Sequence, residues 1–317
     1  MKRNIYSYSK LWMILFVLMG AACTNQVEDA IPVSGQPIGF SVQSDWKEIP
    51  NTRLLIDDNG TMKFTQGDKV QIFGFHKPYS GAVENVQFMY DVDHQNSGQI
   101  VTYDGNNSWN YTPKRFWPKY GLLDFYASYP CDSYNSIHYD VEKKKMTYEN
   151  NLTQDLLYGL ATDWNREKDP TVSIWMVHAL AKVRIILDNS LGDIGQVQVS
   201  GYKTGHFSPM SNNKGVPVWE IDDDKTPISV DFRKYEGKVD EELKNNNSVT
   251  VFILRDKITG LKMWDSGSHL INASDEIQKY TFEAGKVYNL TISKSNGVRK
   301  KNTNSRSIAM SVRCVSE

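Results

Sequence analysis

The sequence has few cysteines and no excess of either charge. Its 317 residues include only three cysteines, so no framework of disulfides holds the fold. The 36 lysines and arginines offset 37 aspartates and glutamates, which leaves a net charge of −1. A chain without surplus positive charge has no field to draw it to nucleic acid or to an anionic membrane. We therefore expect no nucleic-acid partner and a fold held by packed cores.

Catalytic and metal-binding motifs are also missing. The sequence has no G-x-S-x-G elbow, H-E-x-x-H helix, phosphate-binding loop or C-x-x-C pair. The six histidines are scattered, and no two stand at metal-ligand spacing. We predict no enzyme, no catalytic residue, no metal and no cofactor. Paired carboxylates of a hydrolase stay open, because the fold and not the sequence sets their spacing.

The apolar run near the N-terminus is too short to cross a membrane. Residues 11–22 form an apolar stretch of twelve, whereas a spanning helix needs about 20 residues. Basic residues precede it within residues 2–10, and this order is typical of a signal peptide. We predict that residues 1–22 are a signal peptide.

The end of that stretch resembles a bacterial lipoprotein lipobox. Small residues, Gly20-Ala21-Ala22, stand directly before Cys23, although the usual form has leucine where this chain has Gly20. On this interpretation Cys23 becomes the first residue and carries the lipid, residues 23–37 form a linker, and acyl chains tether the protein to a membrane. Ordinary secretion with cleavage near Ala22 is the alternative.

The rest of the sequence is patterned for β-strands. Aromatic residues make up 12% of the chain, and aromatic side chains favour strands. Short apolar runs such as residues 70–75 and 122–129 are separated by turn signals such as Asp104-Gly105. Many short strands between turns predict β-sandwiches. One short helix is expected at residues 153–160.

The length predicts two domains of about 150 residues each. The charged segment 165–170, which ends in proline, divides the chain. We therefore predict an N-terminal sandwich at residues 38–168 and a C-terminal sandwich at residues 169–294. Residues 295–306 are basic and polar without a core residue, so the region 295–317 is predicted as a flexible linker that ends in an isolated strand.

Six segments follow one another along residues 37–293, and together they carry a family resemblance. They are Phe64-x-x-Gly67-Asp68-x-Val70-x-Ile72, Trp109-x-Tyr111-x-Pro113 running into Phe116-Trp117-Pro118, Leu123-x-Phe125-Tyr126-Ala127-x-Tyr129-Pro130, Gln154-Asp155-Leu156-Leu157-Tyr158, Met176-x-His178-x-Leu180-Ala181-Lys182-Val183 and Phe282-x-Ala284-Gly285-Lys286-x-Tyr288-x-Leu290. Taken together behind a lipobox, they resemble the fimbrillin family of Bacteroidetes, the lipoprotein subunits of major and minor fimbriae (type V pili). Read from the residues alone, His178 is expected to be a structural hydrogen-bonding residue.

The resemblance implies an all-β fold of two tandem β-sandwich (transthyretin-like) domains behind a lipoprotein signal peptide. It implies a structural subunit, shaft or tip, of a fimbrium that serves cell adhesion. The precursor would reach the cell outer membrane with palmitate or a similar lipid on Cys23. The implied partners are other copies or related pilus subunits, the outer membrane, an Arg-specific protease, and a receptor on a host or bacterial surface.

The resemblance also implies how such subunits assemble. In the family, a trypsin-like, Arg-specific protease removes an N-terminal strand, and a strand of a neighbouring subunit enters the open groove. Here the implied cleavage lies between Arg53 and Leu54, after a strand that presents Ile38, Phe40 and Val42 at a spacing of two. Backbone hydrogen bonds and alternating side chains would hold the incoming strand.

A second alternating segment lies near the C-terminus. Ile308, Met310, Val312 and Cys314 repeat the spacing of two. A strand that is removed from a groove and the strand that replaces it must both place apolar side chains at every second residue. A shift of one residue would turn the polar side chains into the groove. This segment is therefore the predicted donor strand. The alternative is that residues 307–315 fold back as an edge strand of their own domain.

Two other functions stay open on the sequence alone. A glycan-binding lipoprotein of the outer-membrane surface would use exposed tryptophan and tyrosine on a rigid sandwich. A secreted hydrolase would need a paired carboxylate cleft. The sequence also leaves open whether Cys131 and Cys314 pair.

Overall fold

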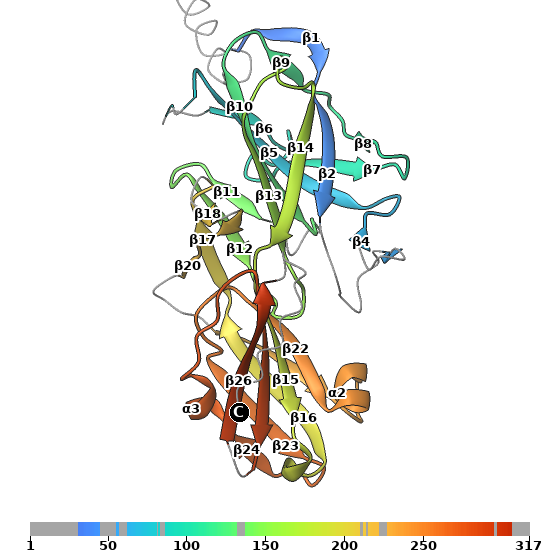
Figure 1. Ribbon diagram of the computed structural model, residues 1–317, viewed down its shortest axis with the longest axis vertical. Coiled ribbons are helices and arrows are strands. Elements are labelled where there is room, and N and C mark those ends of the chain that lie inside the picture. Colours follow the sequence, from blue (N-terminus) through green and yellow to red (C-terminus); the bar gives the residue numbers. More distant parts are fainter. Residues whose placement is uncertain are drawn as a thin grey trace, which may run out of the picture.

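The computed structural model describes ten parts of the chain. These are residues 31–44, 55–56, 62–80, 82, 86–131, 137–209, 212–213, 215–221, 227–294 and 297–305. The described chain runs through two layered groups of strands that lie end to end along the long axis (Figure 1). No helix within these ranges is long and apolar enough to cross a membrane.

Strands make up most of the described chain, which confirms the predicted all-β, sandwich-based fold. The first half contains β1 (Val33–Pro37), β2 (Gly39–Ser44), β3 (Leu55–Ile56), β4 (Met62–Lys63), β5 (Lys69–Lys77), β6 (Val86–Met89), β7 (Gln99–Tyr103), β8 (Trp109–Asn110), β9 (Phe116–Pro118), β10 (Leu122–Tyr129), β11 (His138–Asp140), β12 (Lys145–Glu149), β13 (Leu157–Trp164) and β14 (Thr171–His178). The second half contains β15 (Ala181–Leu187), β16 (Ile194–Tyr202), β17 (Thr204–Phe207), β18 (Asn212–Asn213), β19 (Val216–Pro217), β20 (Glu220–Ile221), β21 (Pro227–Arg233), β22 (Ser248–Ile253), β23 (Gly260–Asp265), β24 (Leu270–Asn272), β25 (Lys286–Ser293) and β26 (Gly297–Ser305). Three short helices, η2 (Asn189–Leu191), α2 (Glu241–Asn246) and α3 (Ser274–Ile277), complete it.

The first half is built on one large sheet with the order β2-β14-β13-β10-β5-β7-β8, and β6 pairs with β5 beside this path. Strand β5 enters after a tight turn in which Gly67 adopts a φ of +93°, a conformation that favours glycine. The two central strands are apolar on both faces. On β5, Val70 and Ile72 pack into one core, whereas Phe73 and Phe75 pack into another.

The second half is a sandwich of two four-stranded sheets, with the orders β22-β15-β25-β26 and β21-β16-β23-β24. Strand β15 shows the alternation of a strand with one buried face. Val183, Ile185 and Leu187 lie in the core, while Lys182 and Arg184 are half-exposed on the other face. This confirms the face that the sequence predicted for these residues.

A third sheet and a third core join the two halves. In the sheet β11-β12-β17-β20, β12 of the first half pairs with β17 of the second, so that Thr147 lies opposite His206. The core beneath it is largely aromatic, and its buried members come from both halves: Phe73, Phe75, Tyr126, Ile137, Tyr139, Met146, Tyr148, Leu156, Tyr158, Ala179, Leu180, Phe207, Trp219, Phe252 and Leu254. We call it the junction core.

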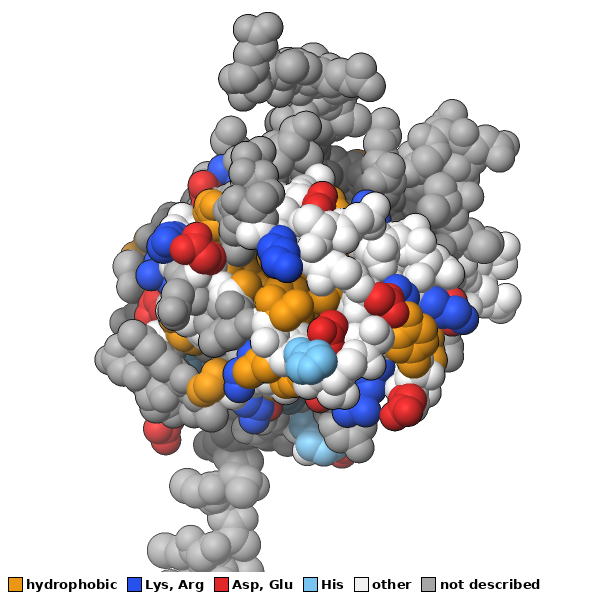
Figure 2. Space-filling model, turned by 90° about the horizontal axis from the view of Figure 1, so that it is seen from below, with side chains coloured by type: hydrophobic (Ala, Val, Ile, Leu, Met, Phe, Trp, Pro, Cys, Tyr) orange, Lys and Arg blue, Asp and Glu red, His pale blue; other side chains and the backbone are white. Residues whose placement is uncertain are grey.

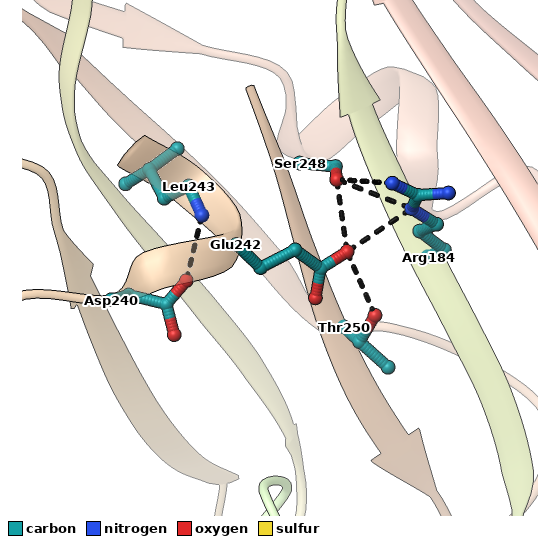
Figure 3. A network of polar contacts seen from close by, with 6 residues as sticks. All are labelled: Arg184, Asp240, Glu242, Leu243, Ser248 and Thr250. Atoms are coloured by element: carbon teal, nitrogen blue, oxygen red, sulfur yellow. Dashed lines mark hydrogen bonds and ion pairs between the residues drawn. The ribbon is translucent and has the colours of Figure 1, made fainter. Parts of the chain in front are cut away.

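Helix α2 is fixed to the second half by a polar network (Figure 3). Asp240 caps the helix by accepting the backbone N–H of Leu243 at 2.8 Å. Glu242 Oε1 lies 3.0 Å from Arg184 Nε on β15, and it also accepts hydrogen bonds from the hydroxyls of Ser248 and Thr250 on β22. One carboxylate therefore ties the helix to two neighbouring strands.

Two predictions within the first half were wrong. Residues 153–160 do not form a helix, because Leu157 begins β13 and Asn151 accepts the N–H groups of Thr153 and Gln154 in a turn that competes with helix. The first sheet also continues past residue 168, since β14 pairs with β13 and with β2. The charged segment 165–170 is the turn between β13 and β14, and the chain leaves the first sheet at 179–180. The division into folding domains stays a prediction.

The predicted flexible linker was wrong over most of its length. Residues Gly297–Ser305 form β26, which pairs antiparallel with β25 from Ser293 to Lys286. The sequence offers one signal for a turn here, because asparagine followed by glycine at 296–297 is frequent in hairpin connections. Lysines on the strand also fit an edge position, where they discourage pairing with other chains.

The junction core predicts a large cost for losing Trp219. Its side chain is 1% exposed, packs against Phe207 at 4.8 Å between ring centroids, and donates Nε1–H to the carbonyl of Ala179 at 2.7 Å. Trp219→Ala should lower the free energy of unfolding by about 3–5 kcal/mol, measured by urea denaturation followed by circular dichroism. Trp175→Ala, at a half-exposed position, is the control and should cost less than about 1 kcal/mol. Equal losses for the two variants would contradict the role of this core.

Candidate functional site

Strand β2 lies at the edge of the first sheet. It stands first in the sheet order and, among the described strands, pairs with β14 alone. The two strands run in the same direction side by side (Figure 1), with Phe40 beside Val172 and Val42 beside Ile174. The strand is therefore held by backbone hydrogen bonds along one side only.

The side chains of β2 and the residue before it alternate between core and surface. Ile38, Phe40 and Val42 are between 2% and 5% exposed, whereas Gln43 is exposed. The ring of Phe40 lies edge-on to Phe125, with 5.4 Å between their centroids. This is the face that the sequence predicted, and it makes β2 part of the core although it sits at the sheet edge.

Tyr111 holds the entry of this strand. Its hydroxyl donates to the carbonyl of Ile38 at 2.8 Å, and its ring lies 5.7 Å from that of Phe40. Burial raises the pKa of Tyr111 to about 12, so the phenol stays protonated as a donor at neutral pH. Tyr111 belongs to one of the motif segments, but its bond to the strand had no sequence signal, because the two residues lie 73 positions apart.

Three predicted site segments lie outside the described residues. They are Cys23, the Arg53–Leu54 bond, and the segment with Ile308, Met310, Val312 and Cys314. Their neighbours along the chain are described. The Arg53–Leu54 bond falls between the end of β2 at Ser44 and the start of β3 at Leu55. The C-terminal segment follows β26, which ends at Ser305.

The chain was compared with known families. The family described as Fimbrillin-like matches residues 52–309, which is most of the sequence. This chain belongs to the fimbrillin-like family.

Solved structures show which folds resemble this fimbrillin-like protein. A candidate cell adhesion protein from Bacteroides ovatus aligns with a TM-score of 0.50 and 13% identity, over 88% of this chain and 100% of that one. A fimbrial protein from Bacteroides vulgatus aligns at 0.44 and 15% (85% and 98%), and the C-terminally truncated tip fimbrial protein Mfa3 from Porphyromonas gingivalis at 0.37 and 9% (75% and 93%). At 13% identity the likeness to the protein from Bacteroides ovatus concerns the fold alone. No curated protein matches the sequence.

The fimbrillin-like motif segments from three parts of the chain meet where the halves join. His178 Nδ1 lies 2.6 Å from Asp155 Oδ2, and both side chains are buried, which confirms the structural role predicted for His178. Gly285 donates its N–H to Leu180 at 3.0 Å, and a Cβ on Gly285 would lie only 3.2 Å from the carbonyl of His178. These segments therefore build the junction.

The surface of the fimbrillin-like protein offers no single-sign patch at the end of its second half. Acidic and basic side chains stand next to each other there (Figure 2), in keeping with the net charge of −1. Within the described ranges, no group of three metal-ligating side chains comes together. The large exposed aromatic side chains come from separate elements along the chain: Tyr79, Phe116, Tyr120, Trp175 and Tyr235.

The hydrogen bond of Tyr111 to the Ile38 carbonyl predicts that the stability of the protein depends on pH. Tyr111→Phe should lower the free energy of unfolding by about 1 kcal/mol at pH 7, because the Ile38 carbonyl loses its donor. Since the folded-state pKa is raised from 10.0 to about 12, the contribution of Tyr111 is complete below pH 10 and is lost as pH rises towards 12. By pH 11.5 the wild type should lose about 2 kcal/mol, which is more than the hydrogen bond contributes, so it should become less stable than Tyr111→Phe at that pH. Urea denaturation at pH 7 and pH 11.5 measures it. A variant that stays less stable than wild type by the same margin at both values would contradict the prediction.

Proposed function

We propose that this protein is a structural subunit, shaft or tip, of a cell-surface fimbria that serves cell adhesion, and that it assembles by exchange of β2 for a strand of another subunit. The observation that carries the proposal is the buried edge strand. β2 and Ile38 directly before it supply three core side chains, yet among the described strands only β14 pairs with the backbone of β2. A strand in this position is removable without breaking the ladder of the strands behind it.

The energetics explain why such a strand needs a replacement. Burying Ile38, Phe40 and Val42 contributes on the order of 5 kcal/mol, at about 1.5–3 kcal/mol for each side chain. Removing the strand without a substitute exposes the rings of Phe125 and Tyr111 and the open edge of β14. An exposed edge of this kind pairs readily with an added strand.

The position of Arg53 fits a cleavage that would release the strand. A cut after Arg53 separates β1 and β2 from β3 onward and breaks no strand. The family match begins at residue 52, so the part shared with the family leaves out β1 and β2. Both observations support a mature subunit that starts at Leu54.

The C-terminal segment supplies the donor in this proposal. β26 is the last strand in the order of its sheet, so the chain that follows Ser305 starts from a sheet edge. Four apolar residues at a spacing of two then present one apolar face: Ile308, Met310, Val312 and Cys314. The same parity in Ile38, Phe40 and Val42 lets one segment occupy the place of the other.

The anchor predicts lipid on Cys23. Cells grown with a clickable fatty acid should label the wild-type protein and leave Cys23→Ser unlabelled, because the thiol is the only attachment point at the lipobox. Cys131→Ser is the matched control and should keep its label. Equal labelling of wild type and Cys23→Ser would end this part of the proposal.

Arg53→Ala should block assembly. Purified wild-type precursor treated with an Arg-specific protease should begin at Leu54 by N-terminal sequencing and form fibres under negative-stain electron microscopy. Arg53→Ala should keep its N-terminal segment and stay monomeric, because β2 continues to fill the groove. Arg166→Ala, which changes an exposed arginine in the turn between β13 and β14, is the control and should assemble normally. Fibres of Arg53→Ala equal to those of wild type would remove the protease step.

If the C-terminal segment is the donor strand, fibre formation should depend on which of its two faces carries a charge. Met310→Asp with Val312→Asp should stop polymerisation of cleaved subunits and leave the monomer folded, because two carboxylates would have to enter an apolar groove. Ala309→Asp with Ser311→Asp adds the same charge on the opposite face and should still form fibres. A chain truncated after residue 306 that forms normal fibres would show that this segment is not the donor.

A further inference from the structure

Three charged side chains meet on neighbouring strands in the first half. Lys77 ends β5, Asp124 lies on β10 and Asp163 lies on β13, and these strands are adjacent in the order β13-β10-β5. Lys77 Nζ lies 2.8 Å from Asp124 Oδ2 and 2.7 Å from Asp163 Oδ1. The side chains of Lys77 and Asp124 are 3% and 1% exposed, so an amine and a carboxyl group are in direct contact away from water.

A bulge aims the third residue at this pair. The pairing of β13 with β10 shifts between Leu123 and Phe125, so that Asp163 is added opposite Asp124. Asp163 adopts a φ of +53°, which is uncommon for a residue other than glycine. In this conformation its backbone N–H donates to Asp124 Oδ1 at 2.8 Å, while the hydroxyl of Ser80 donates to its Oδ2 at 2.9 Å.

The contacts assign a separate chemical role to each group. Asp163 N–H polarises the carboxyl group of Asp124 through Oδ1, as a donor does at a developing oxyanion. Asp163 Oδ1 is buried and faces the amine, where it can take up and return a proton. Burial lowers the pKa of Lys77 and the two carboxylates raise it, with a net upward shift. The resting amine is therefore protonated, and it can become neutral only by passing a proton to a carboxylate inside the cluster.

We propose that Lys77 and Asp124 join in an intramolecular isopeptide bond and that Asp163 promotes the reaction. The ammonium of Lys77 transfers one proton to the carboxylate of Asp124, which gives a neutral amine and a neutral acid. Lys77 Nζ then bonds to Asp124 Cγ, and the C–OH bond breaks. The hydroxyl leaves as water with a second amine proton, carried by Asp163. An ammonium and a carboxylate become one amide and one water, so no oxidant or other reactant is needed.

The product would link the two central strands of the first sheet through their side chains and close a covalent loop over residues 78–123. Positioning of the amine beside the carboxyl group replaces an encounter in solution, which removes the entropic part of the barrier. The proposal does not depend on strand exchange, because all three residues lie within one subunit and on strands other than β2.

The mass of the folded full-length protein tests the proposal. Intact mass spectrometry of purified wild type should find it lighter by one water than its sequence. Trypsin should release the peptide 70–114, which contains Lys77, joined by the isopeptide bond to the peptide 120–143, which contains Asp124. The first peptide stays whole because trypsin does not cut at Lys77, which precedes proline. Protein that is folded by circular dichroism and has the full unreacted mass would overturn the proposal without any variant.

Four variants separate the roles. Lys77→Met should have the full mass, and Lys69→Met, at an exposed lysine on the same strand, should still lose one water. Asp163→Asn keeps both reacting groups and should lack the joined peptide. Asp124→Asn should lose ammonia in place of water and give the same product mass as reacted wild type. Joined peptide in Asp163→Asn at the wild-type level would exclude the role of Asp163, and joined peptide in Lys77→Met would exclude Lys77 as the amine.

Discussion

The first sheet has to be covered on both faces, because its central strands β5 and β10 carry apolar side chains on each side. One face packs against Phe40, Trp117 and other residues of the first half. The other face holds Phe75 and Tyr126, and residues of the second half such as Trp219 complete its cover. The second half is therefore needed to bury a face of the sheet that the first half leaves partly open.

The edge strand is the other consequence of the same layering. A sheet that is buried on both faces ends in a strand whose side chains belong to the core while one backbone edge stays unpaired. β2 is this strand, with Tyr111 and Phe125 against Phe40. β2 thus combines an unpaired backbone edge with side chains that lie in the first core, so its place in the sheet matters for the stability of the whole sheet.

Part of this architecture could be predicted from the sequence. Alternation identified the buried face of β15 and the three core residues of the N-terminal strand, because a period of two is a local signal. The errors arose where one local signal has two meanings. The charged segment 165–170 marks a turn within a sheet as well as a linker, and the residues 297–305, which read as a polar linker, form an edge strand beside β25.

The polar contacts could not be predicted, because they join distant residues. Tyr111 and the carbonyl of Ile38 meet only after folding, and so do Lys77 and Asp124. The sequence gives one indication of the contact between Lys77 and Asp124. Asp124 interrupts the apolar run 122–129, and a carboxylate inside a strand that is buried on both faces needs a partner. The sequence does not say which residue that partner is.

The junction core has a mechanical consequence. Two domains joined by a flexible linker bend at the linker, but here the halves share packed aromatic rings and a sheet in which β12 pairs with β17. Bending this junction would separate interdigitated side chains and break hydrogen bonds at once. The junction should therefore resist bending between the two halves, and in the proposed fimbria the flexibility would be concentrated at the contacts between one subunit and the next.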